Sequence, residues 1–313
     1  MWNKYIAAFI GALMLAGCQI VEEEIINQEP QEVIPEEVTA CYTLIVEASK
    51  GTDTKALSLD GNKLNAYWVT GEEVAVYLND TKLGMLTATV DAVDNTKATL
   101  GGQLTSVAGV AENVVLTLLY PRETWDYTGQ NGAAPFPDGD LATKYDYATA
   151  SVTVATVDDV NRTITSTGNA SFKNQQSMYR FGFKVGGAGE KIEIKEFTVS
   201  SANNALVRTC TRSGNTWIDT PGGITVTAAS TLTLPYVSLR NTLVGTPTSS
   251  QIDANEIIDT YSFSVIGSDD ALYFGSRGIP AQVMDTHGKF ISAQSIAITK
   301  ADMAKTGTAT EVW

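Results

Sequence analysis

Histidine, cysteine and long hydrophobic runs are scarce in this sequence. Its 313 residues include one histidine and three cysteines. A single histidine, His287, excludes a histidine-cluster zinc site, and the polar residues around it predict a solvated turn. Three cysteines do not indicate a fold held together by disulfides. The apolar run Tyr5–Ala16 is shorter than the roughly 20 residues that span a bilayer.

That short apolar run is typical of the core of an export signal. Lys4 supplies a positive charge before it, and Leu15-Ala16-Gly17-Cys18 follows. The last four residues resemble the lipobox of bacterial lipoproteins, in which the cysteine is acylated. We therefore predict a signal peptide over residues 1–17 and a lipid anchor on Cys18, which three acyl chains would hold firmly in a membrane. The alternative is an ordinary secretory signal with an unrelated cysteine nearby.

The charge balance is strongly acidic. The formal net charge is −14, and removing residues 1–17 takes away one lysine and leaves −15. Such a chain is repelled by nucleic acid and by anionic lipid, so nucleic acid is excluded as a partner.

Residues 18–40 predict an extended acidic tether. Gln19–Thr39 contains seven glutamates and two prolines, a composition that does not support a packed core. The cluster Glu22-Glu23-Glu24 resembles the export signal that sends some lipoproteins to the cell surface. We expect a surface-exposed location on the outer membrane.

From residue 41 onward the pattern predicts an all-β protein. Segments that alternate in hydrophobicity or are rich in β-branched residues are separated by predicted turns, among them Gly101-Gly102 and Asp138-Gly139. We predict a first strand with a cleavage segment (41–55), then two tandem β-sandwiches (56–186 and 187–313) that meet at the glycine-rich run after Val185. A single large β domain is the alternative. The predicted strands include Tyr42–Ala48, Glu73–Leu78, Val114–Tyr120, Met178–Val185, Thr231–Tyr236 and Lys289–Ile298.

Signatures of catalysis are missing from the sequence. No glycine loop between a strand and a helix could hold a phosphate. Pro137–Asp140 lacks the further ligands of a calcium loop. Paired carboxylates for glycoside hydrolysis stay open, because their separation is set only in three dimensions. We predict no enzyme activity, no cofactor and no metal site.

A series of segments near the N-terminus resembles the fimbrillin family, the type V pilins and fimbrillin-like lipoproteins of some diderm bacteria. They are Cys41–Ala48, Ala56–Gly61, Leu64–Trp68, Gly71–Tyr77 and Tyr120-Pro121, followed by Ser171–Asn174 and Met178–Val185. The resemblance covers most of the predicted first domain, with Met178–Val185 as its last strand. It implies two transthyretin-like β-sandwiches and a fimbrial stalk, tip or anchor subunit whose partners are other fimbrial subunits.

The resemblance also implies assembly by strand exchange. In this family a protease cuts after a basic residue behind the first strand, and a neighbouring subunit's strand takes its place. The matching bond here is Lys55–Ala56, with Lys50–Gly51 as a second candidate. Lysine stands where the best-known members have arginine, so an arginine-specific protease would not cut. A strand that simply stays in place is the alternative.

The first strand and the C-terminal tail are the two segments that such an exchange would use. Alternation places Tyr42, Leu44, Val46 and Ala48 on one face of the strand, and Thr43, Ile45 and Glu47 on the other. The tail, about residues 294–313, would be the donor. Its predicted contact residues are Ile296, Ile298, Val312 and Trp313. Cys41 and Cys210 should not be bonded to each other, because a bridge would retain the first strand.

A second functional class stays open on the sequence alone. A solitary surface lipoprotein could bind a carbohydrate or another ligand on a host or bacterial surface through exposed aromatics. The candidate platform lies in the acidic stretch 123–148 and consists of Trp125, Tyr127, Tyr145 and Tyr147. Aromatics in such a stretch more often pack onto the body of the protein.

We predict that Cys18→Ala blocks lipid attachment and releases the protein from membranes, because the acylated thiol is removed. Metabolic labelling with a fatty acid measures this directly, and Cys41→Ala is the matched control that should keep its label. Label that persists on the Cys18 variant would contradict the lipobox assignment.

Overall fold

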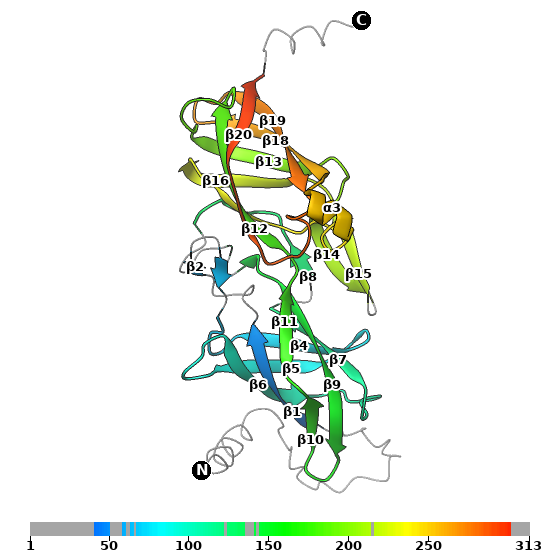
Figure 1. Ribbon diagram of the computed structural model, residues 1–313. Helices are drawn as coiled ribbons and strands as arrows, with labels where there is room; N and C mark the ends of the chain where they lie inside the picture. Colours follow the sequence, from blue (N-terminus) through cyan, green and yellow to red (C-terminus); the bar gives the residue numbers. More distant parts are fainter. Residues whose placement is uncertain are drawn as a thin grey trace, which may run out of the picture.

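The described part of the chain forms two β-rich domains arranged along one long axis (Figure 1). The computed structural model describes residues 41–50, 58–60, 63–65, 67–121, 124–134, 141, 144–213 and 216–301. Nearly all of these residues lie in strands and their connections, so the all-β prediction is confirmed. No helix within these ranges is long and apolar enough to cross a membrane.

The first domain is a sheet that closes on itself. The order of hydrogen-bonded strands is β1-β11-β9-β7-β4-β5-β6, and β6 pairs with β1 to close the ring. Strand β10 pairs with both β1 and β9. The strands are β1 (Tyr42–Lys50), β4 (Glu73–Leu78), β5 (Thr81–Val90), β6 (Lys97–Leu104), β7 (Val115–Tyr120), β9 (Ala148–Asp158), β10 (Thr163–Thr167) and β11 (Ala170–Asn174). A separate small hairpin consists of β2 (Ser58–Asp60) and β3 (Lys63–Asn65).

Strand β1 completes this ring. It pairs antiparallel with β6 from Tyr42 to Ser49. On its other edge it runs parallel to β10 and β11, which follow one another along the chain. Both edges of β1 are therefore paired, and the ring has no exposed edge next to it.

Gly101 and Gly102 do not form the predicted turn. Both lie inside β6, where they pair with Ile45 and Leu44 of β1. A Cβ atom on Gly102 would lie 2.1 Å from the carbonyl oxygen of Met85 on β5. The missing side chain of Gly102 lets β5 and β6 approach closely, so this glycine marks a packing constraint rather than a chain reversal.

The second domain is a sandwich of two sheets. One sheet has the order β16-β13-β18-β19-β20-β12-β17, and the other has β15-β14-β8. Side chains of both sheets share one core that includes Phe181, Phe263 and Cys210. The strands are β8 (Thr124–Asp126), β12 (Ser177–Val185), β13 (Ile194–Ser201), β14 (Val207–Ser213), β15 (Thr216–Pro221), β16 (Ile224–Leu232), β17 (Tyr236–Leu239), β18 (Ile257–Gly267), β19 (Leu272–Pro280) and β20 (Phe290–Lys300), with the short helix α3 (Ser249–Ala254).

Strand β12 does not close the first domain, contrary to the prediction. It pairs with β17 and β20 in the seven-stranded sheet. By strand pairing, the change of sheet falls between Asn174 and Ser177 rather than after residue 186. The stretch around β8 also crosses over, because β8 pairs with β14. Glycine composition suggested the boundary at 186, but the pairing partners of β12 decide it.

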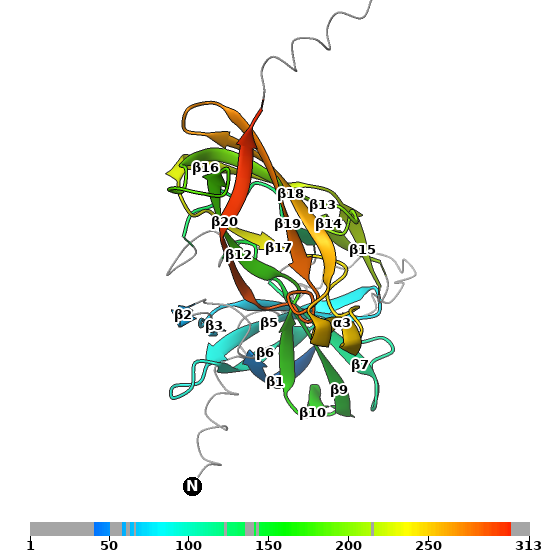
Figure 2. The same ribbon diagram turned by 45° about the horizontal axis from the view of Figure 1, so that its top comes forward.

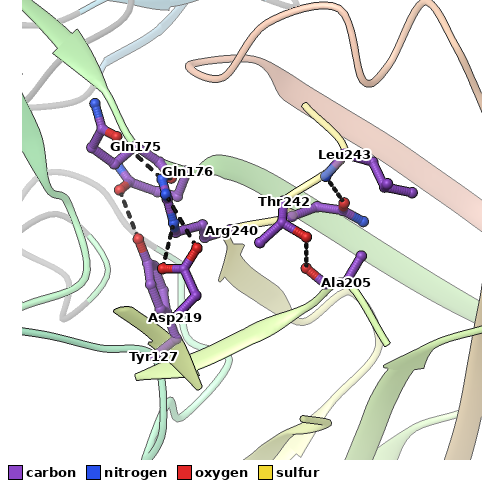
Figure 3. Close-up of polar contacts among 9 residues, drawn as sticks. Tyr127, Gln175, Gln176, Ala205, Asp219, Arg240, Thr242 and Leu243 are labelled. Carbon is purple, nitrogen blue, oxygen red and sulfur yellow. Dashed lines mark hydrogen bonds and ion pairs between the residues drawn. The ribbon is translucent and has the colours of Figure 1, made fainter. Parts of the chain in front are cut away.

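Polar contacts hold the connection between the two domains (Figure 3). The Arg240 guanidinium donates to the backbone oxygen of Gln175 at 3.2 Å and to its side-chain oxygen at 3.1 Å. It also pairs with Asp219 at 3.4 Å. The side chain of Gln176 accepts a bond from the backbone N–H of Tyr147 at 3.1 Å. Gln175 is thus held against Arg240 of the second domain, and Gln176 against the residue that precedes β9.

A second contact joins the domains through the β14–β15 hairpin, which both views place beside the first domain (Figures 1 and 2). Arg212 of β14 donates to the carbonyl oxygen of Asn79 at 2.6 Å and lies 4.5 Å from the ring centroid of Tyr77. Trp217 of β15 packs against the outer-face cluster that contains Tyr77 and Leu119. Burial of this outer face orients the two domains relative to each other.

Candidate functional site: the first strand and the pocket of Lys50

The two faces of β1 are as different as the alternation predicts. Tyr42, Leu44, Val46 and Ala48 are at most 7% exposed, whereas Ile45 on the opposite face is 44% exposed. Burying the larger apolar side chains of the inner face contributes roughly 1.5–3 kcal/mol each, so about 5–8 kcal/mol for the set. A whole domain is stable by only about 5–15 kcal/mol. The strand is therefore a large part of the stability of the first domain.

The start of β1 is bound to the β9–β10 connection. The Tyr42 hydroxyl donates a 2.5 Å hydrogen bond to Asp159, which raises the pKa of Tyr42. The Arg162 guanidinium lies 5.4 Å from the centroid of the same ring. These contacts secure the first inward-facing residue of the strand.

The end of β1 carries a buried cation. Lys50 faces inward, and the residue is 3% exposed. Its ammonium donates to Glu72 at 2.6 Å and to the backbone oxygen of Tyr67 at 3.0 Å. It also lies over two aromatic rings, 3.8 Å from the centroid of Trp68 and 4.7 Å from that of Tyr120. We call the group Tyr67, Trp68, Glu72 and Tyr120 the Lys50 pocket.

The pocket is built to hold a carboxylate and a cation together. Glu72 accepts two further bonds, from the hydroxyl of Tyr120 at 2.8 Å and from the backbone N–H of Val69 at 3.1 Å. Burial and the nearby carboxylate raise the pKa of Tyr120, so its hydroxyl stays protonated as a donor. Trp68 is 2% exposed, and its ring lies edge to face against Phe172 of β11. Aromatic faces attract a desolvated cation, which adds to the ion pair.

Sequence reasoning found the segments of this pocket but not the pocket itself. Leu64–Trp68, Gly71–Tyr77 and Tyr120-Pro121 are among the residues that carry the family resemblance, with no role assigned to Trp68, Glu72 or Tyr120. The signal in the sequence is the position of Lys50, which continues the inward series Tyr42, Leu44, Val46 and Ala48 by one more step of two.

Of the two candidate cleavage bonds, the structure describes a residue only at Lys50–Gly51, where Lys50 is buried. While β1 is paired, the Lys50 side chain is 1% exposed and held by an ion pair. The Lys50–Gly51 bond therefore does not present a lysine that a trypsin-like protease could bind, which argues against it as a cut site in the folded chain. Lys55 and Ala56 lie outside the described residues, as does Cys18.

Half of the predicted donor residues lie in the core of the second domain. Ile296 and Ile298 of β20 are each 1% exposed and pair with Phe183 and Val185 of β12. Using them as a donor would dismantle the seven-stranded sheet, which argues against a donor role for these two residues. Val312 and Trp313 lie outside the described residues, and a donor role for that end of the tail stays a prediction.

The proposed aromatic platform is not on the surface. Trp125, Tyr127 and Tyr147 are at most 1% exposed, and Tyr145 is 8% exposed. Trp125 stacks on Trp217 with ring centroids 3.8 Å apart, inside the second domain. The alternative that these four side chains present a ligand-binding face is contradicted, and the expectation that such aromatics pack onto the body of the protein agrees with their burial.

The cysteines lie in different domains and form no disulfide with each other. Cys41 precedes β1, while Cys210 is buried in β14. Burial and the neighbouring Asp219 raise the pKa of the Cys210 thiol, which keeps it protonated. The described residues contain no group of three or more side chains of the kinds that bind metals.

His287 is not the solvated turn residue that its neighbours predict. Its Nε2 atom is buried and has no hydrogen-bond partner among the described residues. Burial and the nearby Arg240 lower the pKa of the imidazole to about 4. The ring is therefore neutral at pH 7 and belongs to the packing of the second domain.

Comparisons with solved structures give distant similarities. A candidate cell adhesion protein of Bacteroides uniformis is 16% identical, with 83% of this chain and 97% of that chain covered and a TM-score of 0.40. The tip fimbrial protein Mfa3 of Porphyromonas gingivalis is 9% identical, with 83% and 98% covered and a TM-score of 0.33. A fimbrial protein of Bacteroides ovatus is 10% identical, with 83% and 50% covered and a TM-score of 0.32.

No protein-family model matches the chain, and no curated protein matches it significantly in sequence. The function is therefore inferred from the chain's own residues and geometry.

Leu44→Ala should destabilise the first domain by about 3 kcal/mol, because it removes buried methyl groups from the centre of β1 and leaves a cavity. Ile45→Ala on the same strand is the matched control and should cost well under half as much, since Ile45 is largely on the outer face. Urea unfolding of the two variants measures the difference. Equal losses would contradict the assigned faces.

We expect the single histidine to titrate with a pKa of about 4, which NMR of its ring protons can follow without interference from another imidazole. Because the folded protein holds the ring neutral, protonation of the unfolded chain lowers the unfolding free energy as pH falls from about 6.5 toward 4. This loss amounts to about 3 kcal/mol. In His287→Gln, the unfolding free energy should therefore fall by about 3 kcal/mol less between pH 7 and pH 4 than in the native protein. A ring pKa above 6 would contradict the burial.

Proposed function

We propose that this chain is a structural or adhesive subunit of a surface fimbria, exported as a lipoprotein that is anchored in the outer membrane through Cys18. Its partners are other fimbrial subunits, of the same or a related kind, and the membrane through the lipid. The observation that carries the proposal is the position of β1. It closes the ring of the first domain, yet it is also the first strand that the structure describes after the predicted tether.

Loss of β1 would create a site that only another strand can fill. The edges of β6 and of β10 and β11 would lose their hydrogen-bond partners together. The apolar floor now covered by Leu44 and Val46 would be exposed to water. Unpaired edges beside an apolar groove bind an extended segment through backbone bonds and alternate side chains. A strand from a neighbouring subunit satisfies both requirements.

The order of segments along the chain allows one cut to release the strand. β1 lies between the predicted tether and Lys55. Cleavage of Lys55–Ala56 would leave β1 covalently attached only to Cys18 and its lipid. The remainder of the chain would then carry the open groove. The C-terminal tail beyond Ala301 is the proposed donor, since β20 itself is held in the second domain.

Trypsin digestion of the folded protein, followed by size-exclusion chromatography, tests this function, with Lys305→Gln in every chain so that trypsin does not itself remove residues 306–313. Oligomers should appear after cleavage at Lys55 and be absent when Lys55→Gln removes the cut site. Deleting residues 306–313 should abolish the oligomers and leave a folded monomer. Cleaved protein that stays monomeric would contradict a polymerising stalk subunit. Oligomers from the truncated chain would place the donor elsewhere.

A further inference from the structure

The negative charge of Glu72 loses its partner when β1 leaves, because the ion pair at the end of the strand is with Lys50. Glu72 would keep its bonds from the Tyr120 hydroxyl and the Val69 N–H. It would lose Lys50, its ion-pair partner in the described chain. The Glu72 side chain is 13% exposed, so water replaces the lost ammonium only in part. A largely buried charge left without its partner is strongly unfavourable.

The aromatic walls restrict what can replace that ammonium. Trp68 and Tyr120 turn their ring faces toward it, at 3.8 and 4.7 Å from their centroids. Such faces attract a cation and gain less from a neutral group. A free ion from solution would have to be dehydrated and immobilised by the pocket alone, whereas backbone pairing of a docked strand also holds its lysine in place.

The Lys50 pocket accepts the lysine in only one register of β1. Lys50 is the fifth inward residue of β1 and pairs with Phe172 of β11. A slip of one residue would move Lys50 to the outer face, and a slip of two would put it beside the wrong neighbours. Apolar side chains alone would tolerate a slip of two better than a single buried ion pair does.

We infer that the Lys50 pocket selects the strand that occupies the position between β6 and β11 by requiring a lysine eight residues beyond its first inward aromatic. The partner that fits is β1 itself, with its apolar inward residues and terminal inward lysine. The proposed donor tail has only Lys305, with Ala297 and no aromatic eight residues before it, so the pocket favours the chain's own first strand over that tail until cleavage removes the strand. The part of the inference that concerns a neighbour's strand rests on the proposed function. The requirement for a cation opposite Glu72 does not.

Release of the cleaved strand tests the requirement. In the full chain, residues 51–57 are replaced by a seven-residue recognition sequence for a site-specific protease, and the lipoprotein is cut in detergent. Departure of the N-terminal fragment is then followed in a urea concentration at which the native strand leaves over hours. Lys50→Met should leave about 100-fold faster, because Glu72 stays behind without its partner.

Two controls separate the ion pair from general damage to the strand. Glu47→Met changes an exposed charge on the outer face of β1 and should leave the release rate within about threefold. Glu72→Gln combined with Lys50→Met should restore a rate within about tenfold of the native one, since neither buried charge then lacks a partner. Release of Lys50→Met at the native rate, or no recovery in the double variant, would overturn the inference.

Refilling of the groove separates this inference from the proposed function. Peptides with the sequence Tyr42–Lys50, ending in lysine or in methionine, are added after the native fragment has left. Binding of the lysine peptide about 100-fold more tightly than the methionine peptide supports selection by the pocket. Equal binding overturns it. If neither peptide binds, strand replacement fails as the proposed function, and the release rates decide the role of the pocket.

Discussion

Backbone pairing of β1 on both of its edges is the constraint on which the first domain depends. Antiparallel bonds join it to β6, and parallel bonds join it to β10 and β11. A ring of strands has no edge to expose, but it stays closed only while every member is present. Because β1 comes first in the described chain, the strand that closes the ring is also one that a single cut behind it could detach.

Polar and charged contacts are concentrated where this architecture needs a defined geometry. Lys50 and Glu72 determine the end of β1, while Tyr42 and Asp159 hold its start. Arg240 binds the linker between the domains. Buried polar groups are costly without partners, so each contact disfavours other registers or orientations that apolar packing alone would accept. These polar pairs thus determine the register of β1 and the conformation of the linker, which the two apolar cores alone would not determine.

Alternation was a good guide wherever one face of a strand meets the core. The buried and exposed residues of β1 follow the predicted pattern from Tyr42 to Glu47. Composition misjudged Gly101-Gly102 as a turn and left open whether the aromatics around Trp125 are exposed, because composition alone does not reveal which neighbour a residue meets. A glycine pair can permit close strand approach as well as a turn. A crossing segment rich in aromatics can be buried by a sheet that lies far away in the sequence.

The sequence by itself determined the all-β class, the inner face of the first strand and the candidate export signal with its cysteine. These depend on local periodicity and composition, which a chain carries before it folds. Only the tertiary structure decided that β12 belongs to the second domain, that Ile296 and Ile298 are core residues, and that Lys50 is enclosed by Trp68, Glu72 and Tyr120. Each of these depends on pairing between distant segments, because the partner that buries a side chain or completes an ion pair is chosen by packing in three dimensions.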